Sequence, residues 1–160
     1  VSMAGRVVLL MGSKSDLDHV QKITAQLDAF GIAYTMHVAS AHKSVRHLLG
    51  ILESYREVAE PVVFITVAGR SNALGGMVDA NTPHPVITCP PVSSTFGGAD
   101  IFSSLRMPSG VAPLVILEPA GAALAAAKML ALSDASLRER VAAFQEQMTA
   151  ALVEADRGLR

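Results

Sequence analysis

The sequence predicts an α/β fold in which a central parallel sheet is covered by helices on both faces. Short apolar runs rich in β-branched residues alternate along the chain with segments whose apolar residues recur every three or four positions. These patterns are typical of buried strands and amphipathic helices, respectively. Strands that alternate with helices form right-handed βαβ units and hence a parallel sheet between two helical layers. We therefore expect a three-layer αβα sandwich with a long C-terminal helix, built as one domain over residues 1–160.

The composition fits one domain with an aliphatic core. The 160-residue chain is 51% hydrophobic but only 4% aromatic, and it contains no tryptophan. Its mean hydropathy of +0.40 excludes an intrinsically disordered chain. The net charge of −1 lacks the basic excess of nucleic-acid-binding proteins, so we expect no nucleic-acid partner. A local cluster of donors is still sufficient to bind a small phosphorylated ligand.

Three features predict a cytoplasmic protein. The single cysteine, Cys89, cannot form a disulfide within the chain and fits a reducing compartment. No long apolar segment follows the N-terminus, so we expect no signal peptide. The longest apolar region, residues 113–132, is interrupted by Glu118, Pro119 and Lys128, so we expect no membrane span.

Three strand–helix pairs are expected in the first half of the chain. The first helix is marked by Ser15 as a suitable N-cap and by Gly31 as a natural C-terminal stop. Its apolar residues share one face and are Leu17, Val20, Ile23, Leu27 and Phe30. The three strands are expected at residues 7–11, 32–38 and 61–67, and the second and third helices at residues 44–57 and 71–79. This order is typical of flavodoxin-like folds.

The second half of the chain predicts two more strands and two long helices. A polar loop with glycines follows the fourth strand through Gly98, and a helical turn is expected at residues 101–105. The helix over residues 120–132 is rich in alanine, so it is either a central core helix or a subunit contact. A final amphipathic helix begins at Asp134 and can also pack on a neighbouring subunit; its apolar stripe is Leu137, Val141, Phe144, Met148 and Leu152. The two strands are expected at residues 85–89 and 111–117.

Polar residues follow three of the expected strands and mark the candidate site. Open α/β sheets bind their ligands at the carboxyl ends of the strands, so these segments should converge on one edge. The most informative is Ala68–Asn72, where a buried strand ends at a glycine and then presents a guanidinium, a hydroxyl and an amide. The candidate residues of the three segments are Gly12, Ser13, Ser15, Asp16, Ser40, Ala41, His42, Lys43, Gly69, Arg70, Ser71 and Asn72.

The segment Gly12–Asp16 has two interpretations. A glycine turn before a helix offers free backbone N–H groups and the positive end of the helix dipole to an anion. Ser13 and Ser15 add hydroxyl donors, and Asp16 can accept hydrogen bonds from ribose hydroxyls. The same residues also fit an ordinary capped helix start, and the segment is neither a GxGxxG fingerprint nor a P-loop.

Other charged residues also have two interpretations. His42 can move a proton near neutral pH, and Lys43 can pair with phosphate, but a surface His-Lys loop would look the same. Arg106 follows a flexible loop and can bind a carboxylate or a phosphate, or it can be a surface arginine. Asp79 and Asp100 fit turn or cap positions.

No metal site is expected from the remaining histidines or from the cysteine. His19, His37, His47 and His84 have no companion at metal-ligand spacing. His19 and His47 fit exposed helix positions. Cys89 lies within an expected strand, so it should be buried and inert rather than nucleophilic.

As an ordered set, these segments resemble the PurE family of purine biosynthesis. Class I members, which are mutases, typically carry Ser-Ala-His-Arg and a loop with a second histidine. Class II members, which are carboxylases, carry His-Lys and Ala-Gly-Arg-Ser-Asn. Lys43 stands where class I has arginine and Ala73 where class I has the second histidine, so the resemblance is to class II. The matching segments are residues 12–16, 40–43, 68–75, 89–91 and 103–110, and the resemblance runs from about Val7 to Leu132.

The resemblance implies reversible carboxylation of 5-aminoimidazole ribonucleotide (AIR) at ring C4 by CO2, which gives 4-carboxy-AIR in de novo purine biosynthesis. It implies no cofactor: neither ATP, biotin nor a metal. The family counterpart of His42 removes the C4 proton, so His42 is the candidate catalytic residue. The segment Ser13–Asp16 is implied to hold phosphate and ribose, with Arg70 or Lys43 assisting at the phosphate.

Two other functions are weighed against this one. The nearer alternative is the class I reaction, a mutase acting on N5-carboxyaminoimidazole ribonucleotide (N5-carboxy-AIR). An alternative of another class is a non-catalytic nucleotide-binding module.

Members of the family form homo-octamers or smaller even assemblies with active sites near subunit boundaries, so the resemblance also implies a homo-oligomer, an octamer or a tetramer.

Overall fold

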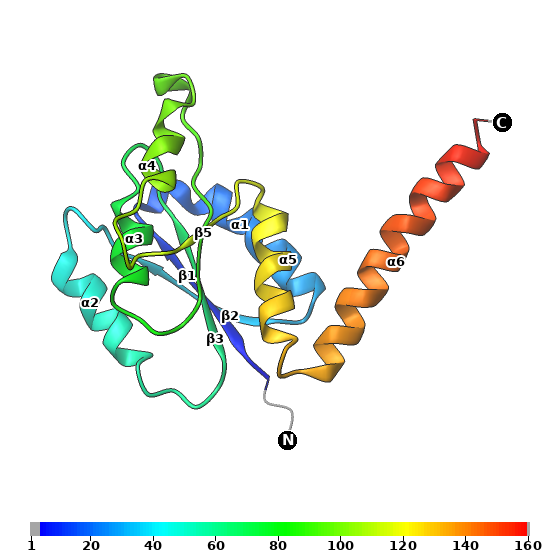
Figure 1. Cartoon of the computed structure of the whole chain (residues 1–160), viewed down its shortest axis with the longest axis horizontal. Helices are drawn as coiled ribbons and strands as arrows, with labels where there is room; N and C mark the ends of the chain where they lie inside the picture. The colour runs from blue at the N-terminus through cyan, green and yellow to red at the C-terminus, as the bar shows by residue number, and fades with distance from the viewer. Residues whose placement is uncertain (1–3, 160) are drawn as a thin grey trace.

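The fold is centred on a parallel sheet, as the sequence predicts. The structure is a computed structural model that describes residues 4–159. Within this range five parallel strands lie in the order β2-β1-β3-β4-β5, which is the flavodoxin-like order (Figure 1). The strands are β1 (Arg6–Met11), β2 (Ala33–Val38), β3 (Val62–Val67), β4 (Val86–Thr88) and β5 (Leu114–Val115).

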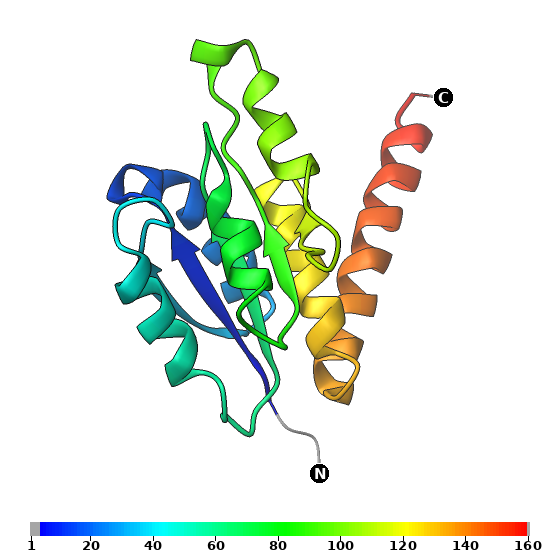
Figure 2. The same ribbon diagram turned by 60° about the vertical axis from the view of Figure 1, so that its left-hand side comes forward.

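Helices cover both faces of the sheet (Figure 2). The side chains of Val7 and Leu9 in β1 pack toward α1 and α5, whereas those of Val8 and Leu10 pack toward α2 and α3. This alternation follows from the two-residue period of a strand, and both faces are apolar because both are buried. The helices are α1 (Leu17–Ala29), α2 (Val45–Ser54), α3 (Ala73–Asp79), α4 (Phe102–Leu105), α5 (Pro119–Leu130) and α6 (Ala135–Arg157).

Helix α5 lies in the core, which decides between the two roles considered for the alanine-rich segment. Ala122, Ala123, Ala126 and Ala127 are fully buried and pack in the same cluster as α1. Small side chains let α5 approach α1 and the sheet closely.

No helix within residues 4–159 is long and apolar enough to cross a membrane.

Helix α6 packs on the body only through its N-terminal part. Leu137 and Val141 are buried, and the Phe144 ring meets the Phe30 ring edge-on with centroids 5.3 Å apart. Beyond this contact the helix projects from the body (Figure 1), and Met148 and Leu152 are 55% and 72% exposed. The predicted apolar stripe is therefore present, but only half of it is covered within this chain.

Strand β5 is shorter than the predicted strand over residues 111–117. Only Leu114 and Val115 pair with β4, which itself has three residues. Before them, the Val111 amide donates to a turn carbonyl at Pro108 and the Ala112 amide donates to Asp79. The edge strand is short because these backbone donors are used elsewhere and Pro113 has none.

The start of α1 also differs from the prediction. A short helical turn, η1 (Lys14–Asp16), precedes α1. Ser13 is the N-cap of this turn and Asp16 is the N-cap of α1, so the predicted cap, Ser15, lies inside the turn. The Ser13 side chain accepts the backbone N–H of Asp16, and the Asp16 side chain accepts the backbone N–H of Ser13. This reciprocal pair of hydrogen bonds is a capping box. Helix α1 ends at Ala29, and the predicted stop, Gly31, lies two residues further on with a positive φ of 65°.

The segment between β4 and β5 forms an arm, residues 92–106, that extends past the carboxyl edge of the sheet (Figures 1 and 2). It contains two short helical turns, η2 (Ser94–Phe96) and η3 (Ala99–Ile101), followed by α4. Gly97 and Gly98 between the turns both have positive φ, at 56° and 84°. The arm thereby turns back on itself and reaches the loop after β3.

Candidate active site

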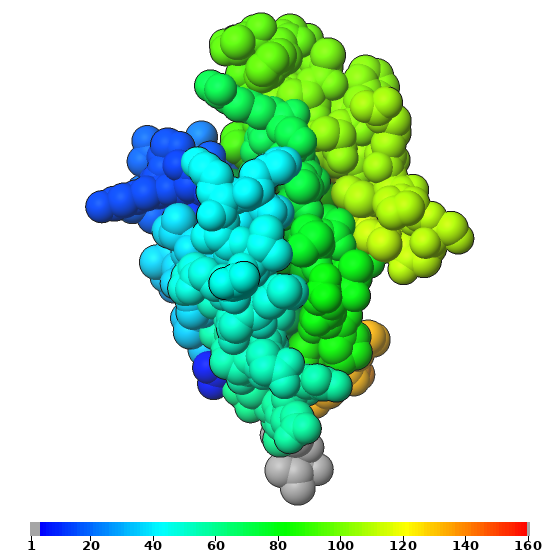
Figure 3. Space-filling model, turned by 90° about the vertical axis from the view of Figure 1, so that its left-hand side faces the viewer, coloured from blue at the N-terminus to red at the C-terminus, as the bar shows by residue number. Residues whose placement is uncertain are grey.

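A cavity of about 510 Å³ opens at the carboxyl edge of the sheet. The loops after β1, β2 and β3 meet there, as Figure 3 shows near the top of the molecule, and the start of the arm closes the fourth side. This is the edge that the strand-end residues predict. The lining residues are Gly12, Ser13, Ser15, Asp16, Ser40, Ala41, His42, Lys43, Ala68, Gly69, Arg70, Ser71, Leu74, Pro91, Val92 and Ser93.

The loop after β1 presents two hydroxyls and a carboxylate to the cavity. The Ser15 hydroxyl donates to the Ser13 hydroxyl oxygen at 2.9 Å, and the Ser15 amide donates to the same atom at 3.3 Å. The Asp16 carboxylate accepts the Ser13 amide at 3.1 Å. Burial raises the pKa of Asp16, while the Ser13 N–H and the nearby His19 act in the opposite direction. Because its own hydrogen bonds join Ser13, Ser15 and Asp16, the turn is ordered without a ligand.

The loop after β2 carries His42 and Lys43 on a turn held by two serines. The Ser40 hydroxyl oxygen accepts the backbone N–H groups of His42 and Lys43 at 3.3 and 3.2 Å. The Ser44 hydroxyl oxygen accepts the Ser40 amide at 2.8 Å. Because these bonds fix the backbone, the exposed His42 and Lys43 side chains are left to face the cavity. Ser40 thus orders the turn in addition to lining the cavity.

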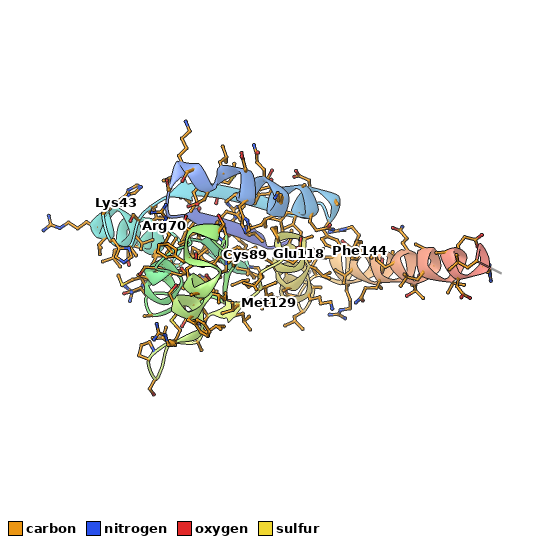
Figure 4. The ribbon with its side chains drawn as sticks, turned by 90° about the horizontal axis from the view of Figure 1, so that it is seen from above. Lys43, Arg70, Cys89, Glu118, Met129 and Phe144 are labelled. Atoms are coloured by element: carbon orange, nitrogen blue, oxygen red, sulfur yellow. The ribbon has the colours of Figure 1, made fainter. Side chains whose placement is uncertain are left out.

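The loop after β3 begins with a close backbone approach. A Cβ atom added to Gly69 would lie 2.6 Å from the Pro91 carbonyl oxygen, so only glycine fits there without movement. The next residue, Arg70, has a φ of 60°, which a residue with a side chain rarely adopts. Arg70 and Ser71 are exposed and line the cavity, and Figure 4 shows Arg70 and Lys43 on the same side of the molecule.

Asn72 lies beneath the cavity rather than on its wall. Its side chain is 2% exposed. The side-chain nitrogen donates to the Thr88 hydroxyl at 2.6 Å and to the Ser104 hydroxyl at 2.9 Å, and its oxygen accepts the Gly75 amide at 3.1 Å. All of these groups belong to the protein, so Asn72 joins the loop to β4, to the arm and to α3.

Arg106 also stays outside the cavity. Its side chain is exposed, and its Nε donates to the Phe102 carbonyl oxygen at 3.3 Å. The structure brings all the other predicted site residues together, from Gly12 to Ser71. The sequence analysis did not include residues Pro91–Ser93, which line the remaining side of the cavity. They follow β4, so the expectation that ligands bind at the carboxyl ends of strands could have found them.

A second group of polar residues lies behind the cavity. His19 Nε2 is 3.4 Å from Cys89 Sγ, so the prediction that His19 is exposed is wrong; it is half-buried against the end of β4. Burial, together with the nearby Glu118, raises the pKa of Cys89 to about 12, and Cys89 and Glu118 lie close together in Figure 4. Cys89 is fully buried, as predicted, and remains a thiol at neutral pH. Within residues 4–159, no group of three or more His, Cys, Asp or Glu side chains could hold a metal ion.

Comparison with known proteins identifies the family. Residues 6–151 match the AIR carboxylase family. The chain belongs to this family. A phosphoribosylaminoimidazole carboxylase of Archaeoglobus fulgidus is 56% identical over 97% of this chain and 85% of its own length. A phosphoribosylaminoimidazole carboxylase of Treponema denticola is 45% identical over 96% of this chain and 97% of its own length.

The fold agrees with that of a solved family member. The crystal structure of Treponema denticola PurE superposes with a TM-score of 0.95 at 44% identity, and covers 98% of this chain and 99% of the other. The flavodoxin-like αβα sandwich and the resemblance to PurE are both confirmed.

Proposed function

We propose that the protein catalyses the reversible carboxylation of AIR at C4 by CO2 to give 4-carboxy-AIR in de novo purine biosynthesis. Membership of the AIR carboxylase family and the names of the two carboxylase relatives support this proposal. The observation that carries it is the cavity itself. One space is lined by His42 and Lys43, by the Ser13–Asp16 turn and by Arg70, so a proton acceptor, a phosphate cradle and positive charge face each other.

The size and chemistry of the cavity fit a small ribonucleotide. Its volume of about 510 Å³ lies within the range of roughly 300–1,000 Å³ that small-molecule sites occupy. The Ser13 and Ser15 hydroxyls supply donors for the phosphate oxygens. The Asp16 carboxylate supplies acceptors for the ribose hydroxyls. Arg70 and Lys43 add the positive charge that phosphate and a developing carboxylate both need.

The carbon–carbon bond forms without a strong base. The amino group of AIR pushes electron density onto C4, so C4 attacks the carbon of CO2 and one C–O electron pair moves onto oxygen. The new carboxylate forms next to the donors of the loops after β2 and β3, which include Lys43 and Arg70. Because C4 is already nucleophilic, we propose that the reaction needs no ATP, biotin or metal.

His42 then completes the reaction. After CO2 addition C4 still carries its proton and the ring is not aromatic. The neutral imidazole of His42 accepts that proton, and the electrons of the C–H bond restore the aromatic ring. In the reverse direction the His42 imidazolium protonates C4 and CO2 leaves. The Ser40-anchored turn holds the His42 backbone at the cavity for both directions.

One assay separates this reaction from its two alternatives. The protein is incubated with AIR and labelled CO2, and separately with N5-carboxy-AIR. We expect labelled 4-carboxy-AIR from the first mixture. The carbamate N5-carboxy-AIR releases AIR and CO2, so any product of the second mixture should carry carbon that has exchanged with dissolved CO2. Product from N5-carboxy-AIR alone, with its carboxyl carbon retained, would show the class I mutase instead. Binding of AIR with no turnover in either mixture would show a non-catalytic nucleotide-binding module.

We also propose that the protein is a homo-oligomer, an octamer or a tetramer. The exposed Met148, Leu152 and Val153 lie on the projecting part of α6, and a second copy of the same chain is the partner that such a stripe fits. Size-exclusion chromatography with light scattering tests this, and a monomeric mass would contradict it.

We place the protein in the cytoplasm, which the buried free thiol of Cys89 fits.

A further inference from the structure

Asp100, a residue of the arm, joins the arm to the loop after β3 by a hydrogen bond. A single carboxylate oxygen, Asp100 Oδ2, accepts the backbone N–H of Arg70 at 3.3 Å and that of Ser93 at 3.0 Å. Arg70 and Ser93 both line the cavity, whereas Asp100 does not. One side chain outside the cavity therefore ties together two of its walls.

The residue that Asp100 holds is the one with the strained backbone. Arg70 has a φ of 60°, and a non-glycine residue keeps such a conformation only where its surroundings enforce it. The arm supplies the restraint on both sides of Arg70. Asp100 accepts the Arg70 N–H, and the Ser103 hydroxyl oxygen accepts the Asn72 N–H at 3.0 Å. The Ser103 hydroxyl donates mainly to the Asp100 carbonyl oxygen at 2.8 Å and lies 3.4 Å from the Arg70 carbonyl oxygen. The direction in which the Arg70 side chain leaves the backbone is thus set by the arm.

The two oxygens of the Asp100 carboxylate differ in their contacts. Oδ2 accepts both amides, whereas Oδ1 is buried and has no hydrogen-bond partner within residues 4–159. The hydrogen bonds that the Asp100 carboxylate makes within this range therefore both go to residues that line the cavity, Arg70 and Ser93.

We propose that Asp100 is a positioning residue for Arg70: it holds the Arg70 backbone in the left-handed conformation that places Arg70 on the wall of the cavity, which Lys43 also lines. Asp100 itself does not touch the substrate. The catalytic part of this inference rests on the proposed function of the cavity, whereas the conformational part does not. The two parts are tested separately.

Amide hydrogen exchange tests the conformational part. In Asp100→Ala, the Arg70 and Ser93 amides lose their acceptor, and we expect each to exchange about 10- to 150-fold faster, the factor that one net hydrogen bond to a charged group provides. Asp79→Ala is the matched control. Asp79 also accepts a distant backbone amide, that of Ala112 at 2.7 Å, but away from the cavity. Unchanged exchange at Arg70 in Asp100→Ala would overturn the inference.

A double-mutant cycle tests whether Asp100 acts through Arg70. Asp100→Ala is made in the wild type and in Arg70→Gly, because glycine adopts the positive φ without restraint. We expect Asp100→Ala to lower kcat/KM for AIR carboxylation about ten-fold in the wild type, within the range of coupling between residues in contact, and less than about two-fold in Arg70→Gly. Asp100→Asn keeps an acceptor oxygen and should retain most of the activity, while Asp79→Ala should match the wild type in both backgrounds.

Each result of the cycle has one meaning. An equal loss in both backgrounds, or no loss in the wild type, would overturn the role of Asp100 in positioning Arg70. If Asp100→Ala does not fold, Ser103→Ala enters the same cycle, because Ser103 contacts the backbone on both sides of Ser71. A wild-type protein that does not carboxylate AIR would overturn the proposed function, and the exchange rates would still decide whether Asp100 holds Arg70.

Discussion

The side-chain nitrogen of Asn72 donates to the hydroxyl oxygen of Thr88 across 2.6 Å. Asn72 is 2% exposed and Thr88 is fully buried. The bond joins the loop after β3 to the last residue of β4, directly below the cavity. A buried polar contact of this kind fixes the geometry of the loop because neither partner can exchange it for water.

Replacing Asn72 with alanine should destabilise the protein. The variant leaves the Gly75 amide and the hydroxyls of Thr88 and Ser104 without their partner, and we expect a loss of about 1–3 kcal/mol in the free energy of unfolding. Urea denaturation followed by circular dichroism measures it. Asn81→Ala is the matched control, because Asn81 bonds the Met77 carbonyl at an exposed position, and it should change stability by less than about 0.5 kcal/mol. Equal losses in the two variants would contradict the role of burial.

Two glycines of the cavity should respond differently to alanine. In Gly69→Ala the new Cβ would meet the Pro91 carbonyl oxygen at 2.6 Å, and backbone must move to relieve the overlap. In Gly12→Ala the nearest atom is the Ala68 Cβ at 3.4 Å, an ordinary contact. We expect Gly69→Ala to cost about 1–3 kcal/mol of stability and Gly12→Ala to cost clearly less, measured by denaturant midpoint. A similar midpoint for both variants would show that the backbone at Pro91 moves away from the new Cβ at little cost in stability.

The place of the site could be predicted from the sequence, but the direction of each side chain could not. Apolar runs predict buried strands, and polar residues after them predict the edge where the cavity lies. Arg70 and Asn72 are two positions apart in one predicted segment, yet Arg70 lines the cavity and Asn72 is buried below it. The difference arises from the left-handed turn at Arg70, which residues of the distant arm hold in place.

The same limit explains the wrong prediction for His19. Helical periodicity places His19 off the main apolar face of α1, because it depends only on local spacing. His19 is instead half-buried in contact with Cys89, which is 70 positions away in the sequence. Contacts of this kind are decided by how α1 crosses the end of β4, and no local pattern in the chain encodes that crossing.

The half-buried His19 predicts a loss of stability in mild acid. Burial lowers the pKa of His19 from its ordinary value of 6.5, and Lys22 lowers it further, while the hydrogen bond with Cys89, Asp16 and Glu118 oppose the shift. As the pH falls through 6.5, the unfolded chain takes up a proton at His19 before the folded protein does, so the free energy of unfolding decreases. Above that pH both states are neutral at His19 and the effect disappears.

His19→Gln should make stability less dependent on pH. Denaturant unfolding at pH 7.5 and pH 5.5 measures the difference for the wild type and the variant, and we expect a smaller difference in the variant. Burial also lowers the pKa of His37, so His37→Gln should reduce the difference independently and the double variant should show the smallest. A wild-type difference that His19→Gln leaves unchanged would contradict the assignment.

His42→Asn should separate binding from turnover. The variant keeps the Ser40-anchored backbone of the loop after β2 but removes the imidazole that we propose accepts the C4 proton. General-base catalysis contributes about 10²–10⁴-fold, so kcat for AIR carboxylation should fall by that factor while calorimetry shows AIR bound within a few-fold of the wild-type affinity. His47→Asn is the matched control, because His47 is exposed on α2 and does not line the cavity, and its kcat should equal that of the wild type. Full activity in His42→Asn would assign the proton transfer to another group, whereas loss of binding together with turnover would make His42 a ligand of the substrate rather than its base.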